Sequence, residues 1–89
     1  MSYIPSNIKE FADRKNATRL VNKVARWVES SGKHISGGTA IGKNYDTLIL
    51  DMRYRGSEIT INLLTEEVKL FGTNVTSPKK FREVLAINQ

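Results

Sequence analysis

Five polar residues in the first third of the chain have a spacing that could bind phosphate groups. They are Lys15, Arg19, Asn22, Lys23 and Arg26. Steps of three and four residues bring side chains to one face of an α-helix, so the four cations would form a row. Such a row can neutralise the phosphates of a nucleic-acid backbone. It could equally be a solvated helix face, although Glu29 is its one accompanying acid.

Further cations extend this candidate surface. Arg53 and Arg55 fall on the polar side of an alternating segment, and Lys79, Lys80 and Arg82 lie near the C-terminus. The whole chain has 14 lysines and arginines against 9 acids, a net charge of +5 and a pI near 9.8. This balance favours a polyanionic partner, either nucleic acid or an acidic protein surface.

A second pattern combines two carboxylates with a lysine. Asp46 is followed by Glu67 and Lys69. Two carboxylates can hold a divalent metal while a lysine helps to place the attacking water. This D…ExK pattern resembles the signature of the PD-(D/E)xK nucleases, over the segment from Asp46 to Lys69 only. The resemblance implies a minimal metal-dependent nuclease as an alternative function, and it requires Asp46 to lie opposite Glu67. The alternative without a function is that these residues are solvated charges at the ends of strands.

The segment 37–44 has the glycine and lysine spacing of a phosphate-binding loop. Asn44 occupies the position where such a loop carries the Ser or Thr that binds magnesium. The residues that follow have the pattern of a strand, whereas a phosphate-binding loop opens a helix. We therefore expect a flexible loop or a hairpin connection.

Composition excludes several kinds of chemistry. The chain has no cysteine and a single histidine, His34, which rules out disulfides, thiolate catalysis and a two-histidine metal site within one chain. We expect no cofactor and no metal. The first residues lack the basic and apolar regions of a signal peptide, and no apolar run approaches the ~20 residues of a membrane helix. These features predict a cytoplasmic protein without membrane contact.

The N-terminal segment predicts a helix that is broken in two. Ser6 or Asn7 can cap the first part, whose apolar stripe includes Ile8 and Phe11. The stripe from Ala17 to Val28 points nearly opposite to it at 100° per residue. We infer a break over residues 13–16, with Asn16 capping a second helix that ends before Gly32. In one continuous helix, Ile8 and Phe11 would instead face a partner.

The centre of the chain predicts a β-hairpin. Leu48, Leu50, Met52 and Tyr54 alternate with polar residues, as do Ile59, Ile61 and Leu63. A two-residue turn at 56–57 would pair Arg55 with Glu58, Tyr54 with Ile59, Met52 with Ile61 and Leu50 with Leu63. Both apolar rows would then share one face of the sheet.

A third strand near Val68 and a helix with Ser77 as cap and Pro78 at its first position complete the prediction. We expect one α+β domain over residues 1–89, with an N-terminal helix that is either broken in two or continuous, an antiparallel meander of about three strands and a C-terminal helix. The favoured function is a small non-enzymatic binding domain. Its basic helix face would contact nucleic acid, or would inhibit or regulate a nucleic-acid-handling protein. The alternatives are the nuclease and a homodimeric structural module that uses Ile8 and Phe11 as its contact.

Overall fold

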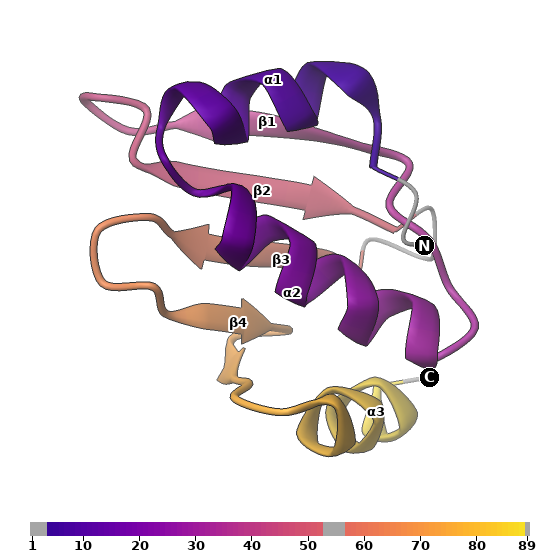
Figure 1. The fold of residues 1–89 in the computed structure, drawn as a ribbon. Helices are drawn as coiled ribbons and strands as arrows, with labels where there is room; N and C mark the ends of the chain where they lie inside the picture. The colour runs from indigo at the N-terminus through magenta and orange to yellow at the C-terminus, as the bar shows by residue number, and fades with distance from the viewer. Residues whose placement is uncertain (1–3, 53–56, 89) are drawn as a thin grey trace.

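A computed structural model describes residues 4–52 and 57–88 (Figure 1). Three helices and five strands occur within these residues. In chain order they are α1 (Ser6–Arg14), α2 (Thr18–Ser30), β1 (Gly37–Ile41), β2 (Thr47–Asp51), β3 (Glu58–Asn62), β4 (Val68–Leu70), β5 (Thr73–Asn74) and α3 (Pro78–Ile87). The strands form one antiparallel sheet in the order β1-β2-β3-β4-β5. The α+β prediction is confirmed, with five strands in place of three.

The two N-terminal helices meet at a tight corner. The N–H of Asn16 donates to the Asp13 carbonyl, and the N–H of Ala17 donates to the Ala12 carbonyl. Asn16 itself has φ +56°, the left-handed conformation that often ends a helix. The predicted break is therefore confirmed. The predicted role of Asn16 as the cap of α2 is wrong, because this residue instead closes α1.

Both helix stripes are buried on the same face of the sheet. In Figure 1, α1 lies over the β1–β2 side and α2 over the β3–β4 side. Ile8 is only 3% exposed, and Phe11 is half-buried against the core. Ile8 belongs to the core, so it is not accessible for the predicted dimer contact, which would have used both residues. α1 also lacks the predicted side-chain cap, since Pro5 precedes it and no side chain bonds to its first turn.

The C-terminal end of α2 and the N-terminal end of α3 follow the sequence predictions. Gly32, with φ +80°, ends α2, and its N–H donates to the Glu29 carbonyl. Ser77 caps α3, because its hydroxyl accepts a hydrogen bond from the N–H of Lys80 at 3.1 Å, and Pro78 occupies the first helical position. The buried side of α3 carries Phe81, Val84 and Leu85.

The predicted hairpin register is wrong, although its faces are right. Leu50 pairs with Ile59, four residues before the predicted partner Leu63, and Leu48 pairs with Ile61. The predicted partners Tyr54 and Arg55 lie outside the described residues. An alternation of period two cannot distinguish registers that differ by an even number of residues. The apolar rows consequently face the helices in either register, and Leu48, Leu50, Ile59 and Ile61 are all buried.

A two-residue turn does occur, but between β4 and β5. Leu70 pairs with Thr73, and the two residues between them, Phe71 and Gly72, have φ +52° and +78°. Positive φ at both central residues is what a type I′ turn requires. The segment that resembles a phosphate-binding loop forms β1 and the start of the β1–β2 connection, so it opens no helix.

Gly38 permits α1 to pack closely on β1. A Cβ atom at this position would lie 2.7 Å from Ile8 Cδ1 and 2.9 Å from the carbonyl oxygen of Ile49. At Gly37, the neighbouring position on β1, a Cβ atom would meet nothing within 4 Å. The two glycines thus differ in surroundings although they are adjacent in sequence.

This difference gives a matched test of the packing. Gly38→Ala should lower the free energy of unfolding by about 1–3 kcal/mol, because the extra methyl must push α1 or β2 away. Gly37→Ala should change it by less than about 0.5 kcal/mol. Urea unfolding followed by circular dichroism measures both values. Equal effects of the two substitutions would contradict the close approach of α1 to Gly38.

Candidate functional site

The outer face of α2 carries three of the predicted cations. Arg19, Lys23 and Arg26 are all exposed, and their spacing places them on one side of the helix. The opposite side of α2 is buried and includes Val24 and Val28, each with no exposed surface. Burial of this apolar side fixes the rotation of the helix, so the cations necessarily point to solvent.

Lys15 does not belong to this row. It is the residue directly after α1, three residues before α2 begins. Its ammonium lies 3.5 Å from a carboxylate oxygen of Asp46 and donates a hydrogen bond to the carbonyl of Asn44. The prediction assumed a helix that runs through residue 15, whereas the left-handed turn at Asn16 redirects the chain. Lys15 therefore braces the β1–β2 loop.

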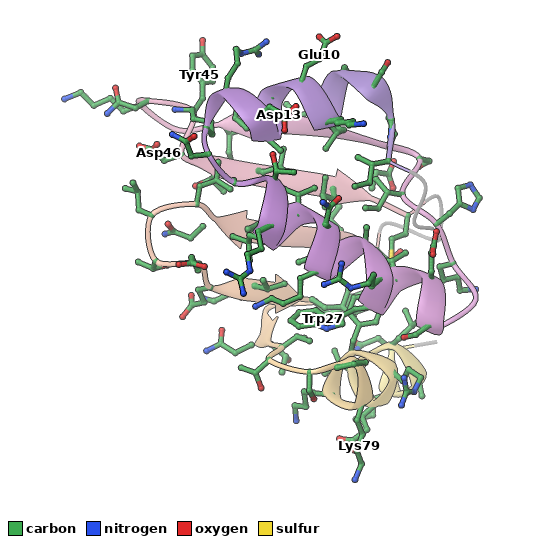
Figure 2. All side chains as sticks on the ribbon, in the orientation of Figure 1. Glu10, Asp13, Trp27, Tyr45, Asp46 and Lys79 are labelled. Carbon is green, nitrogen blue, oxygen red and sulfur yellow. The ribbon has the colours of Figure 1, made fainter. Side chains whose placement is uncertain are left out.

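Trp27 contacts one cation of the basic row, which consists of Arg19, Lys23 and Arg26. Its side chain is only 6% exposed and lies on the side of α2 that faces α3 (Figure 2). The Lys23 ammonium lies 5.5 Å from the centre of the Trp27 ring, a cation–π distance. Asn22 is half-buried at the edge of the row. Trp27 is therefore a core residue whose ring also contacts one of the cations.

The C-terminal helix adds cations beside α2. Arg82 of α3 approaches the Ser30 hydroxyl at 3.4 Å, which places it at the end of α2. Lys79 and Lys80 are exposed on α3, and Lys79 extends away from the rest of the molecule in Figure 2. Arg53 and Arg55, the other predicted contributors, lie outside the described residues.

A solvent-open pocket of about 480 Å³ adjoins the first two turns of α2. Its lining comprises Asn16, Ala17, Arg19, Leu20, Lys23, Leu63 and Glu66. The two cations come from the basic row, and Leu63 and Glu66 come from the β3–β4 connection. Two of the predicted cations thus border a concavity, while Arg26 continues the same face beyond it.

The pocket lies at one end of the molecule, where three loops meet. Leu63 donates its N–H to the carbonyl of Asp46 at 2.8 Å, which joins the β3–β4 loop to the β1–β2 loop. Lys15 joins the latter to the α1–α2 corner. Each loop contains one non-glycine residue with positive φ, namely Asn16, Tyr45 or Glu66. Such conformations cost energy and concentrate at functional sites.

The three nuclease candidates are not brought together. Asp46 points to the helix side, where it pairs with Lys15. Glu67 and Lys69 flank the buried Val68 on β4 and therefore point to the other side of the sheet, where their charged groups are 3.6 Å apart. The predicted pairing of Asp46 with Glu67 is wrong, since Leu63 lies opposite Asp46. Among the described residues, no group of three His, Cys, Asp or Glu could hold a metal.

Comparison with protein families, curated proteins and solved structures finds no match for this chain. Within the part of the chain that the structure describes, no helix is long and apolar enough to cross a membrane. We therefore interpret the candidate site from the positions and charges of its own residues.

Sequence reasoning missed the pocket residues on the loops. The alternation predicts Leu63 as part of the apolar row of a strand, and no sequence pattern singles out Glu66. The usable signal was Asn16, whose placement in the predicted helix break already marked a corner beside the basic row. Nothing in the alternation of β3 indicates that Leu63 leaves the sheet after Asn62.

A double-mutant cycle can measure the bracing role of Lys15. Lys15→Met and Asp46→Asn should each destabilise the fold slightly, with a coupling free energy of about 0.5–1 kcal/mol, because both side chains are largely but not fully covered. Urea denaturation of the two single variants and the double variant measures this coupling. Zero coupling, together with a loss of polyanion binding in Lys15→Met, would instead make Lys15 a ligand contact.

Proposed function

We propose that this chain is a non-enzymatic nucleic-acid-binding protein that holds a phosphate backbone on the outer face of α2. The observation that carries the proposal is the exposed row of Arg19, Lys23 and Arg26. None of the three forms an ion pair with a described residue. Their charge is therefore available to an external anion.

The dimensions of the row suit a nucleic-acid strand. Seven residues separate Arg19 from Arg26, which is about 10 Å along a helix. One strand of a duplex carries a phosphate about every 3.4 Å along its axis, so the row could contact about three phosphates. The buried side of α2 fixes the helix that carries the row, so binding does not have to order this part of the backbone.

A paired charge reversal tests this surface. Arg19→Glu with Lys23→Glu should weaken binding to every sequence, because phosphate contacts carry no sequence information. For the wild type, the logarithm of affinity should fall with the logarithm of salt concentration with a slope of about −2 to −3. The double reversal should flatten this slope. Fluorescence anisotropy with labelled oligonucleotides measures both quantities.

The matched control reverses two cations elsewhere. Lys9 and Arg14 are exposed on α1, and Lys9→Glu with Arg14→Glu lowers the net charge from +5 to +1, as the α2 reversal does. It should retain more affinity than the α2 pair. Equal losses would show that total charge, and no particular face, drives binding. An intact wild type that binds no nucleic acid but captures an acidic protein would overturn the proposal in favour of a protein partner.

Binding should occur without cleavage. The sheet separates Glu67 and Lys69 from Asp46, so the D…ExK residues lack a shared metal position. Incubation of the purified chain with DNA or RNA and Mg²⁺ or Mn²⁺ should leave the strands intact on a denaturing gel. Cleavage that Glu67→Ala abolishes would restore the nuclease alternative.

A further inference from the structure

The pocket beside α2 combines three kinds of lining. Ala17, Leu20 and Leu63 are apolar, Arg19 and Lys23 are cationic, and Asn16 and Glu66 carry hydrogen-bonding groups. Its volume of about 480 Å³ lies in the range of small-ligand sites. A ligand that matches this lining needs a flat apolar part, an anionic part and a polar edge.

We propose that this pocket seats one unpaired nucleotide of a single-stranded nucleic acid, an inference that rests on the proposed function. The base lies against Leu20 and Leu63, and its phosphate faces Arg19 and Lys23. The pocket is continuous with the basic row through these two cations. A strand held on α2 can therefore place one of its nucleotides in the pocket.

A base can enter the pocket only if it is not paired with a second strand. In a duplex, each base is stacked and shows only its edge in a groove, whereas single-stranded bases can be splayed out and buried. A recess beside a helix receives a whole base only in the second case. The geometry therefore favours single strands over duplexes of the same length.

Glu66 gives the pocket a base preference. A carboxylate accepts hydrogen bonds, and cytosine offers an exocyclic amino group where thymine and uracil offer a carbonyl oxygen. Glu66 forms no hydrogen bond or ion pair through its carboxylate within the described chain. The Asn16 amide can donate as well as accept. Cytosine should consequently be preferred to thymine.

Two adjacent glutamates provide a matched pair of variants. Glu66→Gln and Glu67→Gln each raise the net charge by one, but only Glu66 lines the pocket, and Glu67 pairs with Lys69 on the opposite face. Asn16→Gly removes the pocket amide while keeping the left-handed backbone, which glycine adopts readily. All three substitutions can therefore be compared in a folded chain, with circular dichroism as the check.

The experiment measures the affinity of the full chain for single-stranded oligo-dC, single-stranded oligo-dT and a duplex of equal length at one salt concentration. We expect the wild type to favour oligo-dC over oligo-dT about fivefold to tenfold, and either strand over the duplex. Glu66→Gln should remove most of the oligo-dC preference, and Glu67→Gln should retain it. Asn16→Gly should weaken binding to single strands and leave duplex binding unchanged.

The outcomes separate this inference from the proposed function. Equal binding of single strands and duplex, or identical behaviour of the two glutamate variants, overturns the proposal that the pocket binds one unpaired nucleotide. The basic row survives that result if Arg19→Glu with Lys23→Glu still weakens binding more than the α1 control. Absence of nucleic-acid binding by the wild type overturns both, as does selective capture of an acidic protein in its place.

Discussion

The arrangement of the whole molecule depends on the reversal of the chain at Asn16. The apolar stripes of α1 and α2 point in nearly opposite directions along one helical path, so a straight helix could bury only one of them. A single left-handed residue with φ +56° ends the first helix and lets the second begin two residues later. Both stripes can then cover the same face of the sheet. The corner also separates Lys15 from the cations of α2 and forms one wall of the pocket.

The sequence contained enough information for the fold class and for the faces of the elements. Helical periodicity located the break before α2, and the alternation of Leu48 and Leu50 identified the buried side of the sheet. Neither pattern determines which residues lie opposite each other, because a shift by four residues preserves every face. The observed pairing of Leu50 with Ile59 occurs inside a sheet that continues on both sides of the β2–β3 pair, and the local alternation does not encode it.

The cationic helix face of the candidate site could be predicted from local spacing, whereas the pocket could not. A cationic helix face follows from spacing alone, and Arg19, Lys23 and Arg26 are indeed found there. The pocket needs contacts between residues far apart in the chain, since Leu63 approaches Asp46 only after the sheet has formed. The nuclease pattern is a case in which the sequence order suggested a site that the fold does not assemble. Correct residue types in a plausible order are placed on opposite sides of the sheet by strand alternation.

The strand order carries a consequence for the folding rate. Among the described residues, every strand pairs with the next strand in the sequence, so each strand pairing closes only a short loop. Mixed α/β domains with such local topology fold faster than sandwiches with distant strand pairing. The two helices gain their sheet contacts over longer separations, because Ile8 of α1 meets Gly38 thirty residues along the chain and Leu20 of α2 meets Leu63 more than forty residues along. Assembly of the meander can thus precede the docking of both helices, which gives the corner its final shape.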